Sequence, residues 1–228
     1  VNHSNQGKTW ESKYSRPFYN NIIPVVMLDG LFFAVDRTKL SQTFNEDVVG
    51  FHFYDVDFTF SNHLDNVKVG VITNVRITHK SVGETNEEWE KNRELFVKRY
   101  SDKLPSEVDV EVFYPTKEIH IKNQPKLSII IPTKDNIDIL LNCVNSIINK
   151  TKYTNYEIII ADTGSEEKNL KEIKNFCKDK NNIKLVEFDY YNFAQINNEV
   201  VHDHLSDDSK LVLFCNNDIE LINDAISR

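Results

Sequence analysis

The sequence lacks the features that mark several common protein classes. No apolar run approaches the ~20 residues of a membrane-spanning helix, and there is no signal peptide at the N-terminus. Acidic residues outnumber basic ones by 35 to 27, giving a net charge of -8, which argues against a nucleic-acid partner bound through its phosphates. We therefore expect a protein without a transmembrane segment and without a nucleic-acid partner.

Cysteine is also scarce. Cys143, Cys177 and Cys215 have no spacing typical of metal ligands, and each lies in an apolar context. We interpret them as reduced core thiols of a cytoplasmic protein. Otherwise the 228 residues, 40% hydrophobic and 27% charged, have an ordinary globular composition with room for one large or two modest domains.

The second half of the chain contains three apolar runs that each predict a buried strand with an acidic residue after its end. The runs and their acidic residues are Leu127–Thr133 with Asp135, Glu157–Ala161 with Asp162, and Leu211–Cys215 with Asp218. A further strand is predicted over Ile183–Phe188. Because ligands bind at the carboxyl ends of the strands in an open α/β sheet, we expect these carboxylates to meet at one crevice.

Amphipathic patterns between these strands predict helices. The periodic stretches are 136–149, a segment that begins after Ser165, 192–204, and a segment that begins at Asp224. Asp135 and Ser165 are expected to cap the first two of these helices. Alternating strands and helices predict an α/β fold, with a mostly parallel sheet flanked by helices and right-handed crossovers.

The first half is less regular. Ile22–Val35 predicts a strand, a bend at Asp29-Gly30 and a second strand or helix start. Asp36 is expected to cap a helix, and 87–100 is a clear amphipathic helix. Val67–Thr78 predicts a strand or hairpin, and residues 1–21 predict either a surface loop or a disordered end.

Residues 44–60 combine acids with aromatics around Asp55 and Asp57. In a helix, Asp55 would lie near its N-terminus and Asp57 would point elsewhere, whereas in a strand they would share a face. Surrounding aromatics would desolvate a carboxylate here, raise its pKa and suit it to general-base catalysis. On spacing alone, we favour the interpretation of the pair as a helix N-cap with a first-turn acid over a catalytic role. A lone His79 at a strand end also fits a plain surface residue.

The stretches SIIIPTKDN, YEIIIADTGS, NFAQINN and LVLFCNND together resemble the nucleotide-sugar half of a family 2 glycosyltransferase with a GT-A, Rossmann-like fold. The resemblance implies a nucleotide-diphosphate sugar donor bound by Pro132, Thr133, Asp135, Asp162, Asn217 and Asp218. It also implies Mg²⁺ or Mn²⁺ at Asp218. Asn216 and Asn217 make this a reduced version of the usual acidic motif.

The stretches DGLFFAVDR, FNED, GFHFYDVDF and ITHKSVG are similar to the C-terminal, acceptor-side half of a GT-A glycosyltransferase-like family. This resemblance implies that Asp55 is the catalytic base of an inverting displacement, with Tyr54 in place of the usual Glu. It implies that His79 contacts the metal or the diphosphate.

The order of the halves suggests a domain organisation. We expect residues 1–104 to be the acceptor-side part of one domain, 105–125 a proline-bearing linker, and 126–228 the donor-side part of a second domain. A fragment of a larger tandem enzyme and a circular permutation with one shared site both fit this order. We favour the fragment, because the chain does not start with Met and both ends fall inside expected domains. Asp55 and Asp218 would then serve different sites.

The leading hypothesis is a hexosyltransferase-type enzyme that transfers a sugar to a glycan or polysaccharide, in a parent protein that is compatible with peripheral membrane association. A second hypothesis is a non-catalytic glycan-binding or scaffolding domain with a degenerate site, favoured by Asn216, Asn217 and Tyr54. A nucleotidyltransferase ranks last, because residues 132–136 contain no glycine for a phosphate-binding loop.

Overall fold

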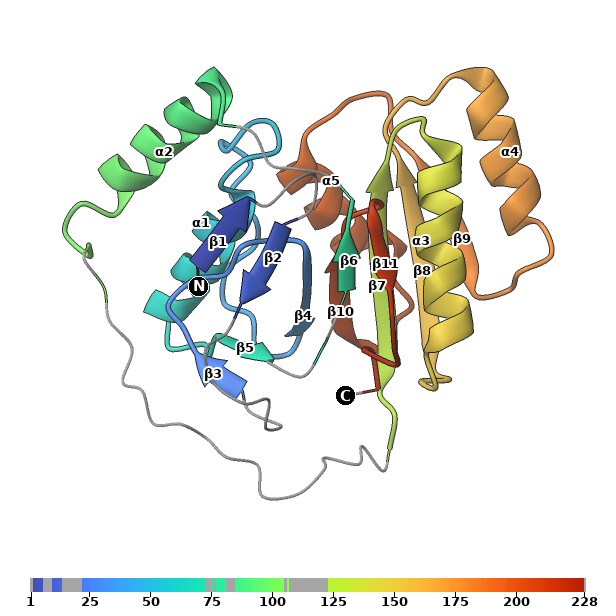
Figure 1. Ribbon diagram of the computed structural model, residues 1–228, viewed down its shortest axis with the longest axis horizontal. Helices are drawn as coiled ribbons and strands as arrows, with labels where there is room; N and C mark the ends of the chain where they lie inside the picture. The colour runs from blue at the N-terminus through green and yellow to red at the C-terminus, as the bar shows by residue number, and fades with distance from the viewer. Residues whose placement is uncertain are drawn as a thin grey trace.

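The structure is a computed structural model that describes residues 2–5, 10–13, 22–72, 75, 77–80, 85–104, 106 and 123–227 (Figure 1). Its helices are α1 (Tyr54–Leu64), α2 (Glu87–Arg99), α3 (Ile137–Lys150), α4 (Glu167–Cys177) and α5 (Phe193–Glu199), which continues as a π-helical turn over Val200–His204. Its strands are β1 (Asn2–Asn5), β2 (Trp10–Lys13), β3 (Ile22–Pro24), β4 (Phe32–Asp36), β5 (Gly70–Ile72), β6 (Ile77–His79), β7 (Lys126–Thr133), β8 (Tyr156–Asp162), β9 (Ile183–Glu187), β10 (Ser209–Cys215) and β11 (Ile219–Leu221). None of the helices in these ranges is long and apolar enough to cross a membrane.

The centre of the molecule is a five-stranded sheet in the order β4-β10-β7-β8-β9. The strands from β10 to β9 are parallel, whereas β4 pairs antiparallel with β10. The predicted α/β class, with a mostly parallel sheet flanked by helices, is therefore confirmed (Figure 1). Three short two-stranded pairs, β1-β2, β3-β5 and β6-β11, complete the described sheets.

Alternation of side chains along the buried strands gives the sheet two apolar faces. On one face, Ile129 and Ile160 pack against α3 and α4 through residues such as Leu140 and Ile173. On the other face, Ile130 and Ile159 belong to a cluster that includes α1, α5 and their aromatic side chains. All of these isoleucines are fully buried, which explains the near-continuous apolar runs in β7 and β8.

The first and second halves of the chain share this core. Phe33 of β4 lies opposite Phe214 of β10 in the sheet, with 5.1 Å between the ring centroids. Phe44 stacks on Phe58 at 4.2 Å and meets Phe193 edge-on at 6.4 Å. The main chain of Phe44 also exchanges two hydrogen bonds with the Asn198 side chain, at 3.0 and 2.9 Å. The two halves therefore form one sheet and one aromatic cluster in this structure.

At the amino edge of the sheet, buried Glu157 ties the end of the π-helical turn to the strands. Its carboxylate accepts hydrogen bonds from the Ser206 N–H at 2.8 Å and from the Ser128 hydroxyl at 2.7 Å, and it pairs with Lys184 at 2.9 Å. Burial favours a higher pKa, but these partners and the Ser206 hydroxyl outweigh it and lower the pKa of Glu157 to about 2.

Most predicted helices and strands of the second half are confirmed. Helix α3 covers the predicted 136–149 within one residue at each end, and β9 covers most of Ile183–Phe188. Asn192 caps α5 by accepting a hydrogen bond from the Gln195 N–H at 3.0 Å. In the first half, α2 matches 87–100 and begins at the cap Asn86.

Several local predictions are wrong. Asp36 does not start a helix, because its side chain and carbonyl close a single turn with Thr38 and Lys39. No helix begins at Asp224, whose carboxylate instead accepts a hydrogen bond from the Lys152 N–H at 3.1 Å. β5 and β6 are not a hairpin, since β5 pairs with β3 and β6 with β11.

Parts of the predicted N-terminal loop are strands β1 and β2, which pair antiparallel. The remainder of residues 1–21, and a predicted edge strand over 108–113, lie outside the described residues, as does most of the predicted linker over 105–125.

Replacing Phe44 with alanine should destabilise both halves together. Phe44 is 4% exposed and contacts aromatic rings from both halves, so truncation should cost about 3–5 kcal/mol. Urea unfolding of Phe44→Ala should show one transition shifted to lower denaturant. Val97→Ala, at a 45% exposed position, is the control and should change stability by less than about 0.5 kcal/mol. Two separate transitions, with only one of them shifted, would contradict a shared core.

Candidate functional site

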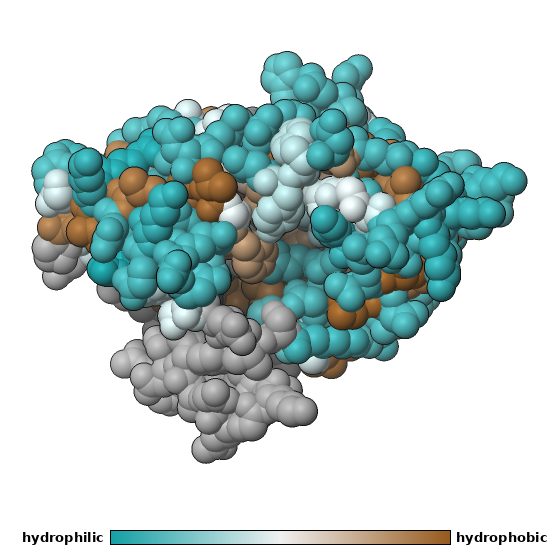
Figure 2. Space-filling view, turned by 90° about the horizontal axis from the view of Figure 1, so that it is seen from above, coloured by the Kyte–Doolittle hydropathy of each residue, from teal (hydrophilic) through white to brown (hydrophobic). Residues whose placement is uncertain are grey.

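The carboxyl ends of β7, β8 and β10 meet at one edge of the sheet, the upper edge in Figure 1. Seen onto this edge, the surface is hollowed in the middle, between the part that carries α1 and α2 and the part that carries α3 and α4 (Figure 2). Thr133 and Asn217 are joined here, because the Asn217 side-chain amide donates to the Thr133 hydroxyl at 3.0 Å. Pro132 immediately precedes Thr133 in the same strand.

Asp135 and Asp162 belong to one hydrogen-bond network at this edge. The Asp162 carboxylate accepts from the Gly164 and Ser165 N–H groups, at 3.2 and 3.0 Å, and from the Ser165 hydroxyl. The Ser165 hydroxyl in turn accepts from the Asp135 N–H at 2.7 Å. The sequence-predicted donor residues of β7 and β8 are therefore connected through Ser165.

The predicted capping roles of Asp135 and Ser165 are wrong. Asp135 and Asn136 have left-handed backbone angles, with φ of 53° and 50°, so the turn leaves α3 without a side-chain cap. Asp135 instead accepts from the Glu166 N–H at 2.8 Å and thereby caps α4. Hydrogen bonds from Asn169 and then Glu166 lower the pKa of Asp135. Two successive non-glycine residues in this region cost on the order of 1–3 kcal/mol each and are typical of functional turns.

The turn after β10 is held by the first half of the chain. The Asn216 N–H donates to the Leu31 carbonyl at 3.2 Å, and the Lys80 N–H donates to the Asp218 carbonyl at 3.3 Å. His79, at the end of β6, places Nε2 3.2 Å from Oδ2 of Asp218. The two residues predicted to contact a metal therefore lie together, although they come from opposite halves.

Asp55 lies in the first turn of α1 and is buried. Of the two arrangements considered for Asp55 and Asp57, the helical one is correct, and α1 turns Asp57 away from Asp55. The Asp55 carboxylate accepts hydrogen bonds from the Gly30 N–H and from the Val56 N–H, the latter at 2.8 Å. Burial raises the pKa of Asp55 to about 7, against the opposing effect of these N–H groups and with help from the nearby charge of Asp29.

Tyr54 and Gly30 complete the surroundings of Asp55. The Tyr54 hydroxyl donates to the Gly30 carbonyl at 2.9 Å, and the Tyr54 ring lies 3.9 Å from that of Phe193 on α5. Burial, then the charges of Asp55, Asp29 and Asp218, raises the pKa of Tyr54. Because Gly30 contacts Asp55 and the next residue, Leu31, contacts Asn216, the start of α1 and the end of β10 lie at the same edge of the sheet.

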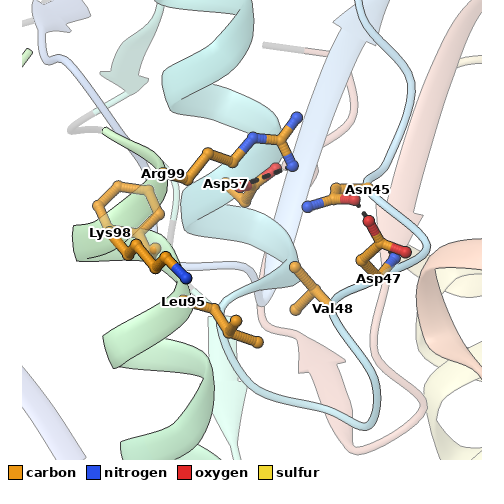
Figure 3. A pocket seen from close by; sticks show the side chains of 8 residues that line it. Asn45, Asp47, Val48, Asp57, Leu95, Lys98 and Arg99 are labelled. Atoms are coloured by element: carbon orange, nitrogen blue, oxygen red, sulfur yellow. Dashed lines mark hydrogen bonds and ion pairs between the residues drawn. The ribbon is translucent and has the colours of Figure 1, made fainter. Parts of the chain in front are cut away.

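Asp57 faces a different space, a cavity of about 340 Å³ between α1 and α2 (Figure 3). Its carboxylate lies 3.7 Å from the Arg99 guanidinium. Burial raises the pKa of Asp57, and Arg99 partly offsets this effect. None of the sequence-predicted site residues lines this cavity, whose walls are Asn45, Asp47, Val48, Asp57, Leu95, Phe96, Lys98 and Arg99. Asp57 therefore serves to join α1 to α2.

Sequence reasoning missed the residues that hold the site together. Leu31 supports the turn after β10 through its main-chain carbonyl, which no side-chain pattern reveals. Ser165 links the Asp162 carboxylate to the Asp135 main-chain N–H rather than capping a helix. One signal is available in the sequence: the Asp29-Gly30 pair, which predicts a bend, contains the residue whose N–H contacts Asp55, Gly30.

Comparison with known families gives two matches that divide the chain. Residues 128–228 match the family described as "Glycosyl transferase family 2", and residues 1–100 match "Glycosyltransferase like family". The chain is 29% identical over 119 residues to the O-antigen biosynthesis protein RfbC of Myxococcus xanthus, covering 52% of this chain and 9% of that protein. The chain spans about a tenth of the length of the curated relatives it matches.

Similar solved structures include residues 1–349 of S. aureus TarS in complex with UDP-GlcNAc, with a TM-score of 0.35 and 21% identity over 43% of this chain and 28% of that one. Another is the mannosyltransferase PcManGT from Pyrobaculum calidifontis in complex with GDP-Man and Mn²⁺, with a TM-score of 0.34 and 17% identity over 49% of this chain and 31% of that one.

Replacing Asp55 with asparagine should remove a pH dependence of stability. The pKa of Asp55 is about 7 in the fold and 3.8 as the ordinary value, so its stabilising effect is fully present below about pH 4 and is lost as the pH rises to 7. Denaturant unfolding at pH 5 and pH 8 should therefore show a smaller difference for Asp55→Asn than for the unmodified protein. An equal difference for both proteins would show that Asp55 titrates normally.

Proposed function

Because residues 128–228 belong to glycosyl transferase family 2 and residues 1–100 match a glycosyltransferase-like family, we propose that this chain provides the donor and acceptor sides of a sugar-transfer site. The reaction is transfer of a sugar from a nucleotide-diphosphate sugar to a hydroxyl of a glycan or polysaccharide. The observation that carries this proposal is the convergence of Asp135, Asp162, Asp218 and Asp55 at one edge of the sheet, in a chain with these family matches.

The donor side of the proposed site is the edge formed by β7, β8 and β10. Pro132, Thr133 and Asn217 form its floor, with the Thr133–Asn217 hydrogen bond fixing the distance between the strand ends. Asp135 and Asp162 are the proposed partners of the base and ribose. Both also stabilise the 162–166 turn, and capping and ligand contact coexist readily at such strand-to-helix turns.

A divalent cation fits the donor chemistry at Asp218 and His79. Mg²⁺ commonly uses one or two carboxylates and completes its shell with substrate phosphates and water. Within the described residues no group of three acidic, His or Cys side chains gathers, so the diphosphate itself would have to supply further ligands. Bound there, Mg²⁺ or Mn²⁺ would neutralise the charge of the departing diphosphate.

The acceptor side of the proposed site is Asp55. In an inverting transfer, the acceptor hydroxyl attacks the anomeric carbon from the face opposite the diphosphate, and a base removes its proton. A carboxylate with a pKa of about 7 is well matched to this step at neutral pH, because it is both partly ionised and basic enough to hold the proton. The residue before the base, which the resemblance implies is usually Glu, is here Tyr54 and carries no charge.

A non-catalytic glycan-binding or scaffolding role is the second candidate. Asn216 and Asn217 leave Asp218 as the one carboxylate of the turn after β10, which would weaken metal binding. Loss of transferase activity in the whole parent protein, with glycan binding retained, would favour this candidate.

Nucleotide binding tests the donor side. UDP and GDP are titrated calorimetrically into the protein with and without Mn²⁺. At least one of the two nucleotides should bind more tightly when Mn²⁺ is present. Asp218→Ala should weaken the metal-dependent binding at least about tenfold. Asp208→Ala removes an exposed carboxylate at the opposite end of β10 and should have no effect. Equal metal-dependent binding by Asp218→Ala and the unmodified protein would contradict the proposed metal role.

Transferase activity of this 228-residue chain tests whether its two halves form one active site. A fragment of a tandem enzyme, with Asp55 and Asp218 in different sites, would release no nucleotide from UDP- or GDP-sugars above hydrolysis in buffer. The single site proposed here instead predicts turnover that Asp55→Asn and Asp218→Ala each abolish. The pairing of β4 with β10 and of β6 with β11 supports that second arrangement.

A further inference from the structure

We infer that the Asp29-Gly30 turn is the positioning element of Asp55, clamped by the hydroxyl of Tyr54. This inference rests on the proposed role of Asp55 as the base. It assigns functions to three residues that lie next to the carboxylate but do not contact the reacting atoms themselves.

The clamp consists of two hydrogen bonds to one glycine. The Gly30 N–H donates to Oδ2 of Asp55, while the Gly30 carbonyl accepts from the Tyr54 hydroxyl at 2.9 Å. Both partners are consecutive residues in the first turn of α1. The two hydrogen bonds hold Gly30 on both sides of its Cα atom. They therefore also fix the orientation of the Asp55 carboxylate.

The contact requires glycine for reasons of space. A Cβ at position 30 would lie 2.5 Å from Cβ of Asp55, 2.9 Å from its Oδ2 and 3.0 Å from the Tyr54 hydroxyl. These distances are far shorter than van der Waals contact, so any side chain at position 30 would push the turn away from α1. The close approach of the main chain to Asp55 thus depends on Gly30.

Tyr54 is rigid enough to act as the clamp. It is 2% exposed, and its ring packs against Phe193 of α5 and Phe51, with centroid distances of 3.9 and 5.7 Å. A phenolic hydroxyl also donates to the Gly30 carbonyl, which an ionised carboxylate in the same position would not do.

Two features of the turn act on Asp55 in opposite directions. The Gly30 N–H stabilises the ionised carboxylate, whereas the negative charge of exposed Asp29 disfavours it. The other charged or titratable groups around the pair are Tyr54 itself and, acting on Tyr54, Asp218 and Tyr191. Changing the charge and changing the clamp should therefore have opposite effects on the protonation of Asp55.

Carbon-detected NMR titration of the Asp55 carboxyl tests this directly, without any transferase assay. Asp29→Asn should lower the pKa of Asp55, because it removes a neighbouring negative charge. Tyr54→Phe keeps the ring and the burial but frees the Gly30 carbonyl, so the N–H bond should loosen and the pKa should rise. Asp102→Asn, at the exposed end of α2, and Tyr153→Phe, whose hydroxyl bonds the Pro125 carbonyl, are the matched controls and should leave it unchanged.

Shifts of Asp29→Asn and Tyr54→Phe in the same direction, or no shift beyond the controls, would overturn the inference. If Tyr54→Phe does not fold, the fall in the pKa of Asp55 expected for Asp29→Asn still tests whether the Asp29-Gly30 turn acts on Asp55, and the absence of that fall would overturn the inference. Where the protein shows turnover, the acidic limb of its pH–rate profile should move with the measured pKa in each variant. A pKa that moves as expected in a protein without turnover would sustain the positioning role and count against the proposed transferase.

Discussion

The antiparallel pairing of β4 with β10 is the contact on which the rest of this molecule depends. It adds a strand from the first half of the chain to a parallel sheet made by the second half, and it aligns Phe33 with Phe214. The aromatic cluster around Phe44 and Phe58 then fills the face of the sheet that α5 leaves open. Because β4 is fixed in this register, Gly30 and Leu31 at its start reach the carboxyl edge, where they contact Asp55 and Asn216.

The sequence was sufficient to predict the parallel strands, because buried apolar runs and helical periodicity are local signals. It was also sufficient to place Asp135, Asp162 and Asp218 at the ends of these strands. It could not place His79 beside Asp218, since their contact requires β6 to pair with β11 across most of the chain length. It also assigned Asp135 to the wrong helix. Asp and Asn adopt left-handed angles more often than other non-glycine residues, but composition does not say at which positions they do so, and here the Asp135 carboxylate reaches α4 instead of α3.

Two buried acids near opposite edges of the sheet, Glu157 in β8 and Asp55 in α1, have pKa values shifted in opposite directions. At the amino edge, hydroxyl, amide and ammonium donors lower the pKa of Glu157 to about 2, so that it is a stable anion. At the carboxyl edge, burial raises the pKa of Asp55 to about 7, because the partners that oppose it among the described residues are main-chain N–H groups and not cations. Both carboxyls are nearly inaccessible, so the difference comes from the number and charge of their donors. A fully satisfied carboxylate anchors structure, whereas a sparsely satisfied one is available for proton transfer.

The separation of β4 from β10 along the chain has a consequence for biosynthesis. Phe33, Phe44 and Phe58 are made well before their packing partner Phe214. Contacts between such distant segments slow folding, since a long stretch of chain must be ordered before they form. During translation these rings are exposed apolar surface, the kind of surface that chaperones bind and that aggregates at high expression. A lower growth temperature and a larger supply of chaperones should therefore raise the yield of folded protein.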